Sequence, residues 1–176
     1  EPGIVAIEAG VLFVPCPHDG NTLASEEEVE LVRTLVDALL GRELCGKDGN
    51  FARKLSLADI LIVAPFNMQV RRLQAELGPS AKVGSVDKFQ GEGKPVVILS
   101  MCTSGHEPTP RGVEFLFNPN RLNVAVSRAE TLAIIVGDPR LALTPVTRVE
   151  QIPLVNGFCR VASASGHYIG KGLKKH

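Results

Sequence analysis

Five short apolar runs alternate with longer segments of helical pattern, and this alternation constrains the fold more than any other feature of the chain. The runs are Val11–Pro15, Ile60–Ala64, Lys82–Val86, Val96–Met101 and Leu132–Val136. Strands that alternate with helices predict βαβ units and a mainly parallel sheet. Several runs are apolar on both faces, as strands are when helices cover both sides of a sheet. We therefore expect an α/β fold.

Helix signals fill the gaps between these strands. The expected helices begin after Ser25, at Asn67 and after Asn118, and the first two end at Gly41 and Gly78. The first start is a capping-box pattern with acids in its first turn, and the third has Pro at the first helical position. Glycine at the two stops is typical of helix ends. Residues 42–57 and 103–114 have no such pattern and are expected to be loops.

Length and composition indicate one globular domain. The 176 residues are 44% hydrophobic and 22% charged, a profile typical of folded proteins. We place the domain at residues 1–162 and expect a flexible tail over 163–176. The chain begins without an initiator Met, so we expect it to be a piece of a longer protein.

Charge and cysteine usage exclude several classes of protein. Lys plus Arg equals Asp plus Glu at 19 each, so there is no bulk positive field, and any binding of nucleic acid must be local, weak or shared with another domain. The four cysteines lie far apart without metal-ligand spacing, which indicates neither a zinc site nor a disulfide framework and favours a reducing, cytoplasmic setting. No apolar run is long enough to span a membrane, and we expect no membrane partner.

The residues that follow or precede the strands form three polar clusters at residues 65–71, 85–94 and 120–129. In open α/β sheets a ligand site lies beyond the carboxyl ends of the strands, so these clusters are the candidates for chemistry. We expect Met68, Phe89 and residues 115–117 to pack in the core or at its rim. The four isolated histidines receive no role.

Arg121 and Arg128 give the third cluster the clearest geometry. They are seven residues apart, so they fall on one face of a helix, from which a guanidinium fork can reach a phosphate. A solvated helix face with ordinary surface arginines explains the same spacing.

The second cluster combines Ser85, Lys88 and two glycines whose backbone N–H groups could approach an anion. Taken alone, however, a surface turn between strands is the simpler interpretation of these residues. A phosphate-binding P-loop is absent from the sequence. In the first cluster, Gln69 could be a polar contact or an ordinary residue of a helix surface.

Read in order, the clusters resemble motifs IV, V and VI of superfamily 1B helicases. The matching stretches are Leu61–Val70, Val83–Gly91 with Val96–Ser100, and Asn120–Ala129. The resemblance implies a RecA-like domain of the P-loop-NTPase type that lacks the P-loop itself. It corresponds to the second, C-terminal motor domain of such a helicase. The wider pattern, which includes Arg111-Gly112, is most similar to bacterial helicases joined to a RecB-like nuclease domain.

The resemblance also implies roles for individual residues. Arg128 corresponds to the arginine finger on the γ-phosphate of ATP. The other residues expected at the nucleotide are Gln90, Gly91, Glu92 and Arg121, and those expected at nucleic acid are Ser85, Lys88, Asn67 and Gln69. No metal ligand is assigned. ATP and Mg²⁺ are expected between this domain and the first RecA-like domain of the same parent chain, so the isolated fragment should be inactive.

The expected track is single-stranded DNA or RNA, with DNA preferred. Two departures from the family pattern leave an alternative open. Glu92 follows Gln90-Gly91 one position earlier than the family's acid, and Glu130 stands where many members have Arg. The domain could therefore be a catalytically degenerate RecA-like scaffold. A stand-alone nucleotide binder is a further alternative, against which the missing P-loop argues.

Overall fold

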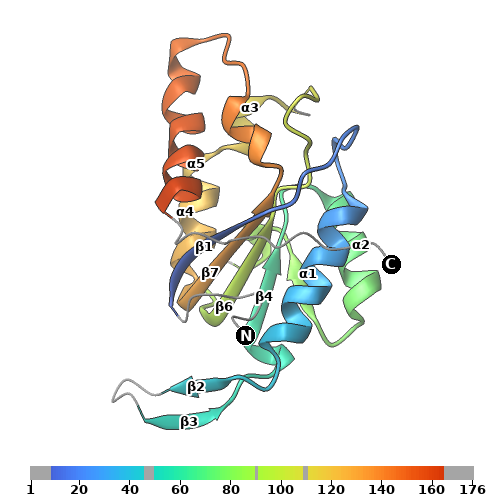
Figure 1. Cartoon of the computed structure of the whole chain (residues 1–176), viewed down its shortest axis with the longest axis vertical. Helices are drawn as coiled ribbons and strands as arrows, with labels where there is room; N and C mark the ends of the chain where they lie inside the picture. Colours follow the sequence, from blue (N-terminus) through green and yellow to red (C-terminus); the bar gives the residue numbers. More distant parts are fainter. Residues whose placement is uncertain (1–8, 46–49, 90, 109–110, 165–176) are drawn as a thin grey trace.

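The computed structural model describes residues 9–45, 50–89, 91–108 and 111–164. Its centre is a parallel sheet of five strands in the order β1-β7-β6-β4-β5 (Figure 1). The strands are β1 (Gly10–Pro15), β4 (Ile60–Val63), β5 (Lys82–Gly84), β6 (Lys94–Ser100) and β7 (Ala129–Gly137). The five predicted strands and the α/β class are confirmed, and only the ends of the strands shift by a few residues.

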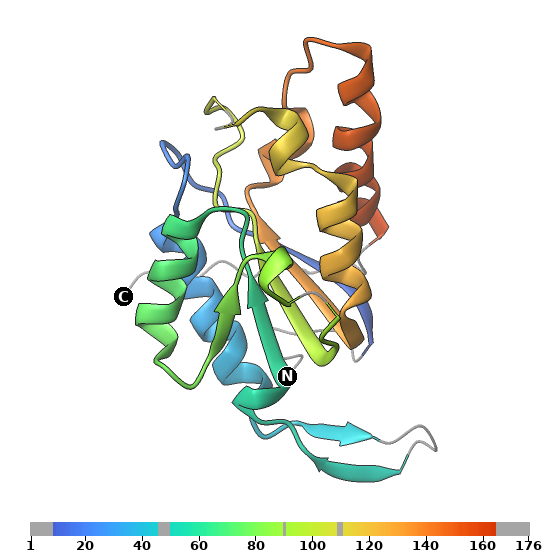
Figure 2. The same cartoon turned by 180° about the vertical axis from the view of Figure 1, so that it is seen from behind.

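Helices cover both faces of this sheet. They are α1 (Glu26–Leu39), α2 (Asn67–Leu77), α3 (Val113–Leu116), α4 (Pro119–Ser127) and α5 (Ile152–Ala164). Helices α1 and α2 pack on one face, and α4 and α5 pack on the other (Figures 1 and 2). Short 3-10 helices lie at η1 (Leu57–Asp59), η2 (Val86–Phe89), η3 (Pro139–Leu143) and η4 (Val149–Gln151). The sheet is thus the middle layer of three, with a hydrophobic core on each side.

The predicted helix signals act as expected. The Ser25 hydroxyl accepts a hydrogen bond from the Glu28 N–H at 3.1 Å, which caps α1. Along α1, Val32 and Leu35 are fully buried against the sheet. Helix α2 ends where Gly78 takes a φ of +84°, a left-handed conformation that glycine adopts without steric cost.

A hairpin and two helices were not predicted. One of the helices, α3, begins inside residues 103–114, which were expected to be a loop. Residues 42–57, expected to be a loop, contain an antiparallel hairpin of β2 (Glu43–Cys45) and β3 (Phe51–Lys54), which projects from the domain (Figure 1). Helix α5 was not predicted either, and it ends at Ala164, the second residue of the segment expected to be a tail. Residues 165–176 lie outside the described part of the chain.

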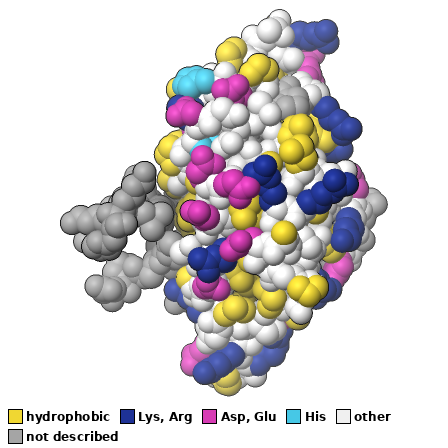
Figure 3. All heavy atoms as spheres, turned by 90° about the vertical axis from the view of Figure 1, so that its right-hand side faces the viewer, with side chains coloured by type: hydrophobic (Ala, Val, Ile, Leu, Met, Phe, Trp, Pro, Cys, Tyr) yellow, Lys and Arg dark blue, Asp and Glu magenta, His cyan; other side chains and the backbone are white. Residues whose placement is uncertain are grey.

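The outer surface of α1 and α2 carries both signs of charge intermixed (Figure 3). Ion pairs account for part of this pattern, since Arg72 pairs with Glu26, and Arg33 pairs with Glu76 at 3.0 Å. The face shown in Figure 3 therefore has no continuous basic surface, which agrees with the balanced composition of the chain.

Candidate functional site

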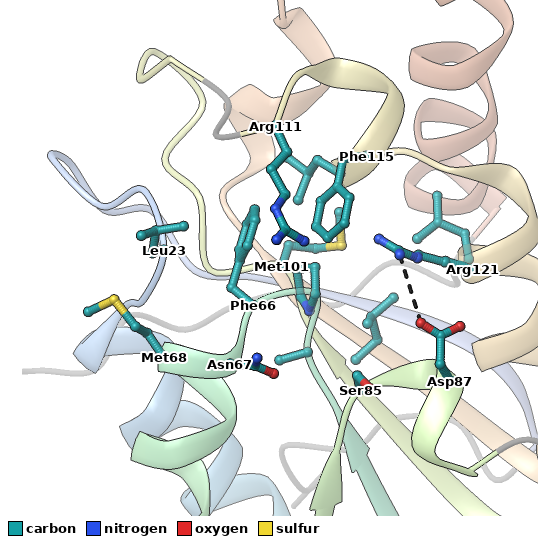
Figure 4. Close-up of a pocket in the computed structure, with 15 residues that line it drawn as sticks. Leu23, Phe66, Asn67, Met68, Ser85, Asp87, Met101, Arg111, Phe115 and Arg121 are labelled. Atoms are coloured by element: carbon teal, nitrogen blue, oxygen red, sulfur yellow. Dashed lines mark ion pairs between the residues drawn. The ribbon is translucent and has the colours of Figure 1, made fainter.

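A pocket of about 500 Å³ opens beyond the carboxyl ends of β4, β5 and β6 (Figure 4). This is the edge of a parallel sheet at which α/β proteins bind ligands. Its lining comes from segments far apart in sequence: Leu23, residues 64–68, Ser85, Asp87, Leu99, Met101, Arg111, Phe115, Leu116, Arg121 and Leu122. The fold thus brings parts of all three predicted clusters to one site.

One half of the pocket is cationic. The guanidinium carbon of Arg121 lies 4.0 Å from the centroid of the Phe115 ring, and that of Arg111 lies 4.9 Å from the same centroid. Both contacts have cation–π geometry. Asp87 approaches Arg121 at 3.8 Å, and its side chain is 75% exposed. A single solvated carboxylate therefore stands opposite two guanidinium groups in the described lining.

The other half of the pocket is apolar. The rings of Phe66 and Phe115 stack with their centroids 5.3 Å apart. Leu23 and Met68 lie on the side of Phe66 that is away from Arg121 (Figure 4). Met68 is 46% exposed, so a large apolar side chain is presented to solvent at the mouth of the pocket. The expectation of packing in the core or at its rim holds for Phe117, which is fully buried, and for the half-buried Phe115, but it was wrong for the exposed Met68.

Three of the residues expected at nucleic acid have accessible positions. Asn67 is the first residue of α2 and lines the pocket, as does Ser85, which directly follows β5. Lys88 is exposed on η2 but is not part of the lining. Its ammonium group donates to the Val83 carbonyl at 3.2 Å and lies 5.3 Å from the centroid of the Phe89 ring.

Gln69 does not have the position expected for a nucleic-acid contact. Its side chain is fully buried, and its oxygen accepts from the Ser25 N–H at 2.9 Å. Its amide nitrogen donates to the Ser25 carbonyl at 3.2 Å and to the Ser100 hydroxyl at 2.9 Å. Because a buried amide with its polar atoms bonded inside the chain cannot also meet a ligand, Gln69 ties α2 to α1 and β6 instead.

Gln69 belongs to a larger buried network that sequence reasoning missed. Glu28 accepts from the Ser100 hydroxyl at 2.6 Å and from the Cys102 N–H at 3.0 Å, and it bonds His18 Nε2 at 2.9 Å. The other ring nitrogen of His18 lies 2.7 Å from the Ser104 hydroxyl. Burial disfavours the charged ring, but the hydrogen bond and the charge of Glu28 outweigh it and raise the pKa of His18 above its usual value.

Arg128 lies at the opposite edge of the sheet from the pocket. It is the C-cap of α4, and its carbonyl accepts from the Lys94 N–H at 2.9 Å, where β6 and β7 begin. Its Nε atom is buried and has no hydrogen-bond partner among the residues that the structure describes. A buried donor of this kind is costly unless a ligand or another domain satisfies it.

Glu92 lies at the same edge. Its carboxylate pairs with Lys82 at 2.5 Å and with Lys94 at 3.7 Å, and the bond from Lys82 lowers its pKa. The neighbouring Gly91 has a φ of +85°, which only glycine adopts readily. Gln90, expected beside them, lies outside the described residues. The turn that leads into β6 is thus held by two lysines and by the start of β7.

The two arginines of the third cluster serve different places. The two residues are seven positions apart, so they lie on the same side of the helix but about two turns apart along its axis. Arg121 reaches the pocket, whereas Arg128 stands with Gly91 and Glu92 at the amino ends of β6 and β7. Arg121 and Arg128 were both expected near the nucleotide, and the structure places them at opposite edges of the sheet, with Arg121 beside Ser85 and Asn67.

Two further features are absent from the described ranges. No group of three or more His, Cys, Asp or Glu side chains is arranged to hold a metal ion. No helix among these residues is both long enough and apolar enough to cross a membrane.

A parallel five-stranded sheet with helices on both faces and a pocket beyond its carboxyl edge agrees with the expected RecA-like domain. Residues 16–140 match a family model described as an AAA domain. Curated relatives agree with this class. RNA helicase Mov10l1 of Homo sapiens is 32% identical over 139 residues, which are 75% of this chain and 11% of that protein.

Two other relatives are similar to shorter parts of the chain. DNA-binding protein SMUBP-2 of Mesocricetus auratus is 39% identical over 126 residues, 70% of this chain and 11% of that protein. DNA polymerase alpha-associated DNA helicase A of Schizosaccharomyces pombe is 40% identical over 87 residues, 48% of this chain and 13% of that protein. The chain belongs to the AAA domain family and is a superfamily 1 helicase domain; it spans about a tenth of the length of these relatives.

Proposed function

We propose that this domain is the second motor domain of an ATP-driven superfamily 1 helicase or translocase. In this proposal ATP binds between it and the first RecA-like domain of the same parent protein, and a single strand of nucleic acid crosses the pocket edge of the sheet. DNA is the preferred track, since two of the three relatives above are named for DNA. RNA remains the alternative, which the name of the third relative favours.

The observation that carries the proposal is the environment of Arg128. Its Nε is buried without a partner in the described chain, and its carbonyl lies near Gly93, in the turn that leads into β6. A phosphate oxygen would satisfy this donor and would match the planar fork of the guanidinium group. Because no P-loop is present, the first domain would hold the β-phosphate and Mg²⁺, and the residues here fit only the γ-phosphate side.

In this arrangement Arg128 stabilises the charge that develops on the γ-phosphate oxygens during hydrolysis. The backbone of Arg128 is held in place before β7 by the hydrogen bond from the Lys94 N–H to its carbonyl. Glu92 holds the adjoining turn through Lys82 and Lys94. Because both lysines engage Glu92, the acid is not free, and this favours the degenerate scaffold as the second candidate function.

The test of the arginine finger uses the full-length parent protein. Arg128→Ala should lower kcat for ATP by roughly 10³ while ATP affinity and Tm stay close to wild type, because the contact forms only in the transition state. Arg128→Lys should recover little of this activity, since Lys lacks the planar fork. Arg160→Ala, on the exposed side of α5, is the matched control. An unaltered kcat in Arg128→Ala would refute the assignment and favour the scaffold.

Glu92 needs a separate experiment. Glu92→Gln should lower kcat if the carboxylate assists turnover despite its early position, and it should leave kcat unchanged if it only braces the turn. We infer the second result, because the pKa-lowering pair with Lys82 gives the carboxylate a structural partner. A strong loss of kcat without a loss of stability would overturn that inference.

We also propose a cytoplasmic setting and an attached RecB-like nuclease domain in the parent protein. The free state of Cys16, Cys45, Cys102 and Cys159 supports the first proposal. Fractionation of cells that express the parent protein tests the location. Metal-dependent cleavage of single strands by the purified parent tests the nuclease, and a parent without such cleavage would contradict it.

A further inference from the structure

Glu130 lies at the amino edge of the sheet, beside the turn that leads into β6. It is the second residue of β7, two positions after Arg128, and its side chain is exposed. A Cβ atom added at Gly93 would lie 3.2 Å from Glu130 Oε1 and 3.7 Å from Glu130 Cγ. The Glu130 carboxylate therefore occupies the space that a side chain at position 93 would enter.

The two acidic side chains of this edge differ in their partners. Glu92 pairs with Lys82 at 2.5 Å and with Lys94 at 3.7 Å. The Glu130 side chain has no hydrogen bond or ion pair in the part of the chain that the structure describes. An ionised carboxylate accepts hydrogen bonds and cannot donate them. Of these two acids, Glu130 is thus the one that a hydrogen-bond donor of a ligand can meet.

Arg128 provides a second group without a partner close to the same space. Its carbonyl oxygen lies 3.7 Å from the Cβ position at Gly93, and its buried Nε has no partner among the described residues. A phosphate oxygen suits this guanidinium group but is repelled by the Glu130 carboxylate, because both are negatively charged acceptors. Glu130 suits a neutral donor, and the hydroxyl donors of ATP are those of its ribose. Since two positions along a chain span at most about 7 Å, one nucleotide can contact both side chains.

We propose that Glu130 accepts a hydrogen bond from a ribose hydroxyl of ATP when the γ-phosphate contacts Arg128, and that this contact selects ATP over its deoxyribose forms. The inference rests on the proposed function, because it needs ATP at this edge of the sheet. The family pattern has its acid at position 93 and, in many members, Arg at position 130, whereas this chain has Gly93 and Glu130. The carboxylate thus reaches the same space from β7 rather than from the turn.

The test measures the turnover of ATP and of its analogues by the full-length parent protein. Deoxy-ATP forms that lack the 2′ or the 3′ hydroxyl probe the ribose, and inosine triphosphate lacks the amino group of the base, which is the other donor of ATP. The variants are Glu130→Ala alone and Glu130→Ala combined with Gly93→Glu, which returns a carboxylate to the same space. Gly93 is not among the residues with positive φ, so its backbone accepts a side chain. Glu150→Ala, at an exposed glutamate of η4, is the control.

The wild type should have a kcat/KM about tenfold higher for ATP than for the deoxy form that lacks the contacted hydroxyl, because that analogue leaves the carboxylate without its donor. Glu130→Ala should raise KM for ATP about tenfold, keep kcat within about twofold of wild type and remove the preference. The double variant should regain the preference. A merely structural role for Glu130 would affect ATP and its deoxy forms alike, and a carboxylate at position 93 would not rescue it.

Loss of the preference in Glu130→Ala and its return in the double variant support the proposal. A wild type without a preference would overturn it, as would an unchanged preference in Glu130→Ala or a double variant with wild-type Tm that does not regain the preference. If Glu130→Ala impairs the turnover of ATP but not that of inosine triphosphate, the donor is the base amine and the assignment to the ribose is wrong. The proposed motor function fails on a different measurement, the kcat of Arg128→Ala with ATP.

Discussion

Replacement of Glu28 by Ala should destabilise the domain more than most single changes. Glu28 is fully buried and bonds three groups: His18 Nε2 at 2.9 Å, the Ser100 hydroxyl at 2.6 Å and the Cys102 N–H at 3.0 Å. Each buried group left without a partner costs about 1–3 kcal/mol, and the loss of one member of a buried ion pair costs about 3–5 kcal/mol. We expect a loss of about 4 kcal/mol.

Glu28→Gln should be milder, at about 1–2 kcal/mol, because the amide keeps the shape and one acceptor oxygen. The penalty should depend on pH. Since the folded-state pKa of His18 is raised, its contribution is fully present below the unfolded pKa of about 6.5 and is lost as the pH rises through the folded value. Both variants should therefore lose more stability at pH 6 than at pH 9, relative to wild type.

Urea and thermal unfolding of the purified chain at both pH values measure these effects. For a domain of this length about 4 kcal/mol corresponds to a fall in Tm of roughly 10 °C. Glu30→Ala, an exposed glutamate on the same helix, is the control and should be close to neutral. A Glu28→Ala loss below about 1 kcal/mol, or an equal loss at the two pH values, would refute the reasoning.

Three further predictions concern other parts of the chain. Gly105→Ala should lower the free energy of unfolding in urea by about 1–3 kcal/mol, since the new Cβ would lie 2.4 Å from the carbonyl carbon of Arg140. A variant as stable as wild type would contradict this close packing. Thiol labelling under native conditions should modify the exposed Cys45 before the buried Cys16. Burial and, to a smaller extent, the charge of Glu28 raise the pKa of Cys16 to about 12, so its thiol stays protonated and unreactive. Equal labelling rates for the two cysteines would contradict this. The isolated chain should hydrolyse no ATP and bind it no tighter than about 1 mM by calorimetry; micromolar affinity would overturn the divided site.

The sheet was predictable because its signal is local and strong. Runs such as Ile60–Val63 are buried along their whole length, so their apolar pattern reports their place directly. The hairpin escaped prediction because the residues of β3 are all exposed and show no alternation. Helix α5 escaped because it contains Pro153 and Gly157, which normally end helices. Pro153 is tolerated because it lies in the first turn of the helix.

The site was predictable only in part. Asn67 and Ser85 follow strands, and the rule for open sheets places such residues at one edge. Helical spacing puts Arg121 and Arg128 on one side of a helix. It does not reveal that Arg121 lies at the carboxyl edge of the sheet and Arg128 at the amino edge. Arg111 lines the pocket from a backbone with a φ of +62°, a left-handed conformation that no sequence periodicity encodes. The burial of Gln69 depends on partners in α1 and β6, far away in sequence.

The strand order affects how the chain folds while it is being synthesised. Among the described strands, the first, β1, pairs only with the last, β7, and Val11 stands opposite Ala133. During synthesis, at about 5–20 residues per second, β1 therefore waits roughly ten seconds for its partner to be made. Throughout that interval an apolar strand has unpaired edges while β4, β5 and β6 can already assemble. Pairing between strands so distant in sequence makes folding slow. While the chain is being synthesised, the strand Gly10–Pro15 is therefore the segment that a ribosome-bound chaperone would protect from aggregation.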